Sequence, residues 1–65
     1  MPQAQLRWVS SLMIAKSGEA SAIVKEYLSY SMPRKRELFI TYRGKRYTYQ
    51  DARYLLDDLE SDEGG

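Results

Sequence analysis

Apolar residues in the first half of the chain recur at the spacing of a helix. Between Ala4 and Lys16 there is no proline or glycine, and apolar side chains fall on one helical face, at Leu6, Val9, Leu12 and Met13. A second apolar stripe runs over residues 19–31, at Ala20, Ile23, Val24, Tyr27 and Leu28. The pattern predicts two helices separated at Gly18, with Pro33 ending the second. Fusion into one long helix stays an alternative, because a glycine within a helix costs only about 1 kcal/mol.

The period changes to that of strands after residue 37. The segments 38–42 and 47–49 are rich in β-branched and aromatic residues, and Arg43-Gly44 lies between them. Glycine can supply the positive φ of a tight turn, so the pattern predicts a two-stranded hairpin. A two-residue loop would place Tyr42 opposite Lys45 and Ile40 opposite Tyr47. A bulge at Gly44 would shift the register by one residue, and the sequence leaves both open.

A third helix is predicted after the hairpin. Thr48-Tyr49-Gln50-Asp51 is a variant of the capping box, and it precedes an apolar stripe at Ala52, Leu55, Leu56 and Leu59. The acidic, glycine-ended residues 61–65 are predicted to be a disordered tail. We therefore expect an α+β fold with the order α-α-β-β-α, in which residues 1–60 form one domain.

The composition excludes most kinds of catalytic site. Cysteine and histidine are both absent from the 65 residues, so disulfides, Ser–His and Cys–His pairs and a typical zinc site are excluded. A chain of this length also leaves little room for a catalytic pocket. We expect a protein that is not an enzyme, with no catalytic residues, no metal site and no cofactor.

The chain has no segment typical of membrane proteins or of secretion. Its apolar runs are shorter than the roughly 18 residues of a membrane span, and Met1–Gln5 lacks the basic start of a secretory signal. The absence of cysteine is typical of a reducing compartment. We therefore expect a cytoplasmic protein with no membrane partner.

Charge is strongly segregated although the net charge is only +1. Residues 34–46 hold six of the ten basic residues, opposed only by Glu37, and residues 51–63 hold six of the nine acidic ones. Cations contact phosphates and exposed aromatic rings stack on bases, so a basic hairpin favours DNA or RNA as the partner. The candidate nucleic-acid-binding residues are Arg34, Lys35, Arg36, Tyr42, Arg43, Lys45, Arg46 and Tyr47. Such a protein would suit a prokaryotic or viral regulator, although tight turns also expose long polar side chains without any function.

The tyrosine content supports an alternative, a protein–protein module. Six tyrosines occur in the chain, and Tyr30 and Tyr54 fall outside the apolar stripes of their predicted helices. Tyrosine is favoured at protein interfaces, so these two are the candidate interface residues. A small domain without disulfide or metal is often stabilised by association, which makes a homodimer one version of this hypothesis. An assembly component or an inhibitor of a larger machine is another.

Two segments resemble known families. Ile14–Gly18, with Val24 six residues later, resembles the turn of a helix-turn-helix motif. That resemblance implies a winged-helix DNA-binding domain with the recognition helix over residues 19–31. The spacing from Ala15 to Gly18 is one residue short of the motif, and the usual preceding helix is missing. Residues 22–60 are similar in element order to small phage head–tail joining proteins, which implies a role in structural assembly.

Overall fold

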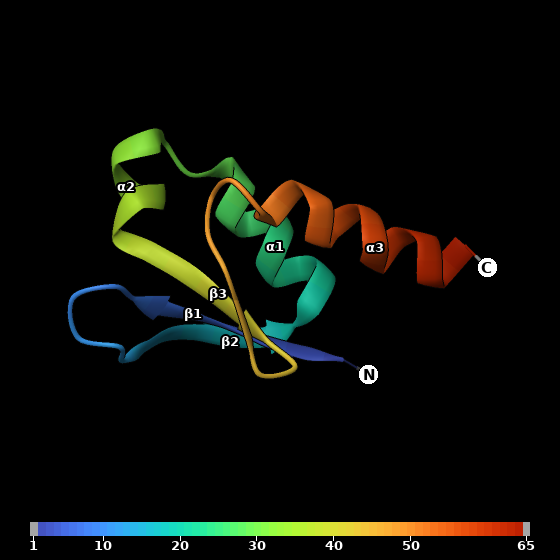
Figure 1. Cartoon of the computed structure of the whole chain (residues 1–65), viewed down its shortest axis with the longest axis horizontal. Coiled ribbons are helices and arrows are strands. Elements are labelled where there is room, and N and C mark those ends of the chain that lie inside the picture. The colour runs from blue at the N-terminus through green and yellow to red at the C-terminus, as the bar shows by residue number, and fades with distance from the viewer. Residues whose placement is uncertain (1, 65) are drawn as a thin grey trace.

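The chain folds as a four-stranded antiparallel sheet covered on one side by helices (Figure 1). The computed structural model describes residues 2–64, with side chains to residue 61. The sheet order is β2-β1-β3-β4. In chain order the elements are β1 Gln3–Trp8, β2 Ile14–Glu19, α1 Ala20–Ser29, α2 Met32–Glu37, β3 Leu38–Tyr42, β4 Lys45–Tyr47 and α3 Ala52–Gly64.

The N-terminal hairpin β1–β2 stands where the sequence predicts a helix over residues 4–16, so that prediction is wrong. The order is β-β-α-α-β-β-α instead of α-α-β-β-α. Residues 3–8 also alternate between polar and apolar, and this period of two places Ala4 and Leu6 in the core, each 1% exposed. The predicted helix would also bury three further apolar residues, Val9, Leu12 and Met13, yet these are exposed. Leu12 has a φ of 63°, which no helix residue adopts.

Because Gly18 lies in β2, both predictions for it, a break between two helices and a position within one long helix, are wrong. This residue pairs with Ala4 inside the sheet, so it neither separates two helices nor joins them. The segment that resembles a helix-turn-helix turn is therefore extended, and the winged-helix expectation is wrong.

Two helices, α1 and α2, follow the first hairpin, where the sequence predicts a single helix over residues 19–31. The predicted helix over residues 19–31 is confirmed as α1, which ends at Ser29. Pro33 does not terminate it. It lies in the first turn of α2, where a missing N–H leaves no helical hydrogen bond unmade.

The second hairpin forms with the two-residue loop, but its second strand is β4 Lys45–Tyr47, so Thr48 and Tyr49 of the predicted strand lie beyond it. Tyr42 pairs with Lys45 and Ile40 with Tyr47, which excludes the bulged register. Arg43 and Gly44 have φ angles of 52° and 77°. Positive φ at both central residues is the geometry that matches the twist of two adjacent strands.

The last helix, α3, begins at Ala52 as predicted. Ala52, Leu55 and Leu59 are buried, whereas Leu56 is half-buried beside them. The helix packs against α1 and runs through residues 61–64, which the sequence assigns to a tail. The division of the chain into one domain and a tail stays a prediction.

Tyr27 connects the helical layer to the sheet. Its side chain is fully buried, and its hydroxyl shares its one proton between the carbonyl oxygens of Lys35 at 2.8 Å and Leu38 at 3.0 Å. One phenol thereby joins α1 to the junction between α2 and β3. Burial raises the pKa of Tyr27 to about 12, and the nearby Tyr49 adds a smaller contribution in the same direction.

Replacing Tyr27 by phenylalanine should lower the free energy of unfolding by about 1–3 kcal/mol, because two carbonyls lose a buried donor. Urea denaturation measures this change. Tyr54→Phe is the matched control, since Tyr54 is 72% exposed and the same atom is removed there into solvent. Equal stability of the two variants would contradict the assigned role of the Tyr27 hydroxyl.

The raised pKa of Tyr27 also predicts a loss of stability at alkaline pH. The folded state favours the neutral phenol, so its contribution is complete below the ordinary pKa of 10.0 and declines as pH rises toward about 12. The parent should therefore lose more stability over this range than Tyr27→Phe does. Ultraviolet titration of the phenolates should show a tyrosine in the parent that ionises near pH 12 and is missing from the variant.

Candidate functional site

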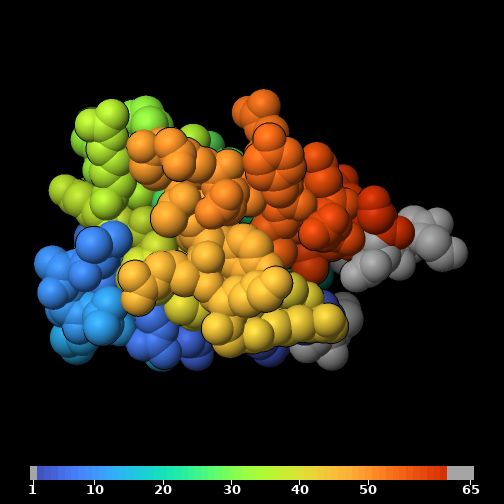
Figure 2. Space-filling model, in the orientation of Figure 1, coloured from blue at the N-terminus to red at the C-terminus, as the bar shows by residue number. Residues whose placement is uncertain are grey.

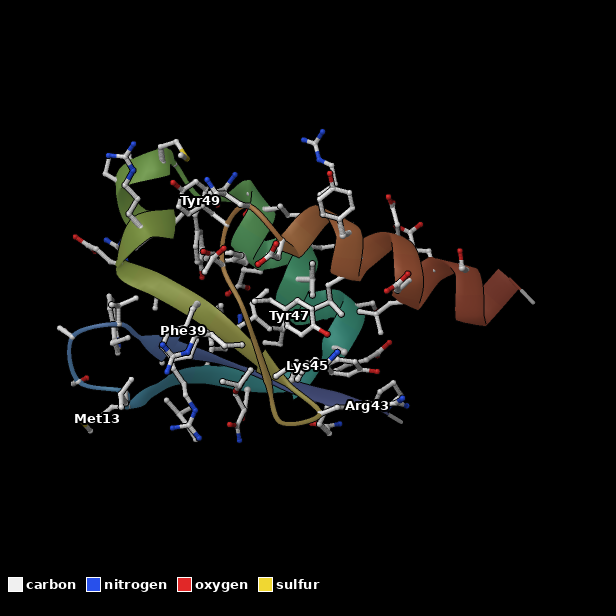
Figure 3. The ribbon with its side chains drawn as sticks, in the orientation of Figure 1. Met13, Phe39, Arg43, Lys45, Tyr47 and Tyr49 are labelled. Atoms are coloured by element: carbon white, nitrogen blue, oxygen red, sulfur yellow. The ribbon has the colours of Figure 1, made fainter. Side chains whose placement is uncertain are left out.

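The face of the sheet turned away from the helices is polar and cationic. The register places Arg7 opposite Phe39, Gln5 opposite Thr41, and Thr41 opposite Arg46, so these five side chains share one face. The alternate residues of β1 and β3 point into the core beneath the helices. We call the polar side the open face. Figure 3 shows Phe39 beside β3, below the helices.

A shallow cavity of about 360 Å³ occupies one end of the open face. Its wall includes two arginines, two glutamines, a threonine and a tyrosine, and no acidic residue belongs to it. The lining residues are Gln3, Gln5, Arg7, Thr41, Tyr42, Arg43 and Gly44. Such a set of donors around positive charge is suited to an oxyanion such as phosphate.

Arg7 is held in position by its neighbours. Its Nη1 donates to the carbonyl oxygen of Leu12 at 2.7 Å, and its Nη2 donates to Oε1 of Gln5 at 2.9 Å. The hydroxyl of Thr41 donates to the same Gln5 oxygen at 3.4 Å. The Gln5 oxygen is thus occupied, while its amide nitrogen donates to no acceptor among the described residues.

Phe39 is the aromatic residue of the open face. It is only 3% exposed although it lies outside the core cluster beneath the helices. The guanidinium of Arg46 lies 4.6 Å from the centre of its ring and contributes the cover. A cation over an aromatic ring is attracted by the negative charge of the ring face.

The two tyrosines predicted to contact nucleic acid lie on the other side of the sheet. Tyr42 is 8% exposed and Tyr47 is half-buried, and both belong to the wall of a second cavity of about 410 Å³ between the β3–β4 hairpin and α3. Arg43 lies over the Tyr42 ring at 5.3 Å. Arg46 is on the opposite face from both tyrosines. Arg43 and Lys45 line the same cavity as the tyrosines, so the structure brings four of the predicted residues together there, Tyr42, Arg43, Lys45 and Tyr47.

The basic residues of segment 34–46 form two groups at opposite ends of β3. Arg43, Lys45 and Arg46 are at the hairpin, whereas Arg34, Lys35 and Arg36 lie on α2. The Nε of Arg34 is 3.7 Å from a carboxylate oxygen of Glu37, and its guanidinium lies 6.0 Å from the centre of the Trp8 ring. The structure therefore does not combine all six cations in one patch.

The sequence misses Arg7 as a site residue. Its assignment to a helix conceals the alternation of Gln3, Gln5 and Arg7, which is the signal for a polar strand face. The predicted set also omits Thr41, because a hydroxyl in a β-prone run has no distinctive pattern.

The predicted interface tyrosines differ in environment. Tyr54 is 72% exposed, whereas Tyr30 is half-buried and donates a hydrogen bond to Glu26 at 2.7 Å. Glu26 also pairs with Lys16 across α1 and β2. The pKa of Glu26 is lowered mainly by the Lys16 hydrogen bond and then by the one from Tyr30.

The β1–β2 turn is an exposed apolar feature that the sequence analysis does not anticipate. Val9, Leu12, Met13 and Ile14 are between 48% and 66% exposed. Figure 2 shows this turn at one end of the molecule, far from the visible part of α3.

Comparisons with known proteins assign no family to the chain: no protein-family model, curated protein or solved structure matches it. Over the described residues, no cluster of acidic side chains has the arrangement of a metal site. The helices in that part of the chain are also too short or too polar to cross a membrane.

The β3–β4 turn that carries Arg43 should be sensitive to substitution. Gly44→Ala places a side chain at a φ of 77° and should cost about 1–2 kcal/mol of unfolding free energy. Gly18→Ala is the matched control, because its new Cβ would meet only Ile23 at an ordinary 3.9 Å. Thermal denaturation of both variants measures the difference, and equal stability would contradict the positive-φ turn.

Proposed function

We propose that the protein is a non-enzymatic nucleic-acid-binding protein that contacts phosphates through the open face. The observation that carries this proposal is that, over the residues the structure describes, no carboxylate forms an ion pair with the arginines of that face. In the described part of the chain the two ion pairs are Lys16–Glu26 and Arg34–Glu37, so Arg7, Arg43 and Arg46 have no carboxylate partner. Cations without partners can exchange counterions for phosphates.

The distribution of acidic residues supports the same proposal. Asp51, Asp57, Asp58 and Glu60 belong to α3 or the turn before it, on the helical side of the sheet (Figure 1). By register Glu19 shares the open face, opposite Gln3 at the end of β2. A polyanion approaching this face still meets mainly arginines, with the acidic side chains of α3 behind the sheet. A cytoplasmic location forms part of this proposal and rests on the cysteine-free composition.

A protein–protein module is the second candidate, and the exposed β1–β2 turn favours it. Contiguous exposed apolar side chains often mark protein interaction sites. This candidate places the partner at Met13 and its neighbours or at Tyr54, away from the cavity of the open face. It predicts weak nucleic-acid binding that is insensitive to the open-face arginines.

The test is the salt dependence of oligonucleotide affinity in two charge-matched variants. Arg7, Arg43 and Arg46 are replaced together by glutamine in one variant, and Arg34, Lys35 and Arg36 in the other. Each phosphate contact contributes about −0.7 to −0.9 to the slope of log affinity against log salt. The open-face variant should lose about two units or more of slope, and the α2 variant should lose less.

Fluorescence anisotropy measures both slopes, and circular dichroism shows that each variant remains folded. Equal losses in the two variants would overturn the assignment to the open face. Failure of the parent to bind DNA or RNA at about 50 mM salt would overturn nucleic-acid binding itself.

A further inference from the structure

We propose that Phe39 is a base-stacking platform and that the ligand of the open face is single-stranded DNA or RNA. This inference rests on the proposed function and adds the strandedness of the nucleic acid. It starts from the position of the ring, which belongs to the open face by register but is 3% exposed. A phenylalanine on a polar, helix-free face is not required by the helical core.

The cover over Phe39 is a movable side chain. Arg46 belongs to β4, a three-residue strand at the edge of the sheet, and the residue is exposed. Its guanidinium contacts the ring at 4.6 Å and pairs with no carboxylate of a described residue. A long side chain held this way can leave the ring without backbone movement and without breaking an ion pair.

A nucleobase could take the place of the Arg46 guanidinium on Phe39. Both are flat groups that bind the face of an aromatic ring, and stacking of a base on an aromatic side chain tolerates any sequence. The displaced guanidinium would then be available to a phosphate of the same strand. The exchange keeps the ring covered in both states and adds a charge contact in the bound one.

Polar groups for the edge of a stacked base adjoin the ring. Arg7 is the cross-strand partner of Phe39, and Gln5 and Thr41 form the next pair on the same face. Their guanidinium, amide and hydroxyl groups can hydrogen-bond a splayed base. Bases inside a duplex are stacked on one another and cannot reach a flat sheet, so the arrangement favours a single strand.

The experiment compares three probes on the unmodified protein. These are a single strand of about ten nucleotides, an abasic strand with the same number of phosphates, and a duplex of the same length. DNA and RNA versions of the single strand are both used. The base-containing strand should bind about tenfold or more tightly than the abasic one, and more tightly than the duplex.

Two substitutions then assign the preference to the ring. Phe39→Leu keeps an apolar residue without a stacking face, and it should bind the base-containing and abasic strands equally with an unchanged salt slope. Phe39→Trp keeps a stacking face and should retain the preference. Denaturation curves establish that both variants fold.

The outcomes separate this inference from the proposed function. Equal affinity of the parent for base-containing and abasic strands, or a preference for the duplex, would overturn the inference while leaving nucleic-acid binding in place. A preference that survives in Phe39→Leu would also overturn it. Absence of binding to every probe at low salt would overturn both.

Discussion

The pairing of β1 with β3 is the constraint on which the other features depend. It joins two hairpins that are separated in the chain by α1 and α2, and it makes a four-stranded sheet from two ribbons that are each marginal alone. The same register also assigns every side chain of these strands to a face. Leu6 and Ile40 enter the core opposite each other, while Gln5 and Thr41 meet on the open face. Tyr27 reinforces this pairing because its hydroxyl holds the carbonyl of Leu38, where β3 begins.

The helices of so short a chain cover only one side of the sheet. On the other side, the strands' own side chains must shield apolar groups from water. Phe39 illustrates how this is achieved, since it is nearly inaccessible although it lies outside the core cluster beneath the helices, and Arg46 lies over its ring. Arginine serves this purpose well because its aliphatic stem can lie along apolar surface while its head group remains in water. The residues that complete the fold on this side are therefore the ones that carry the proposed interaction.

Local patterns account for part of the fold, and long-range pairing accounts for the rest. α1, α3 and the β3–β4 hairpin follow from periodicity and from Arg43-Gly44, all within a few neighbouring residues. The N-terminal hairpin does not, because Leu6, Val9 and Leu12 fit a helix by local spacing. Pairing on both sides, with β2 next to it in the chain and with the distant β3, selects the strand. The candidate site follows the same division: the sequence identifies Arg43 and Arg46, whereas the face that Arg7 shares with them depends on the sheet.

The separation of the open face from the acidic helix α3 makes the molecule an electric dipole with almost no net charge. A dipole has consequences for molecules of the same kind as well as for a ligand. At low ionic strength the positive side of one copy attracts the negative side of another, and little net repulsion opposes their approach. Added salt weakens this attraction, because at 0.1 M salt exposed charges more than about 10 Å apart are largely screened from each other. We therefore expect the protein to salt in, becoming more soluble as electrolyte is added to dilute buffer.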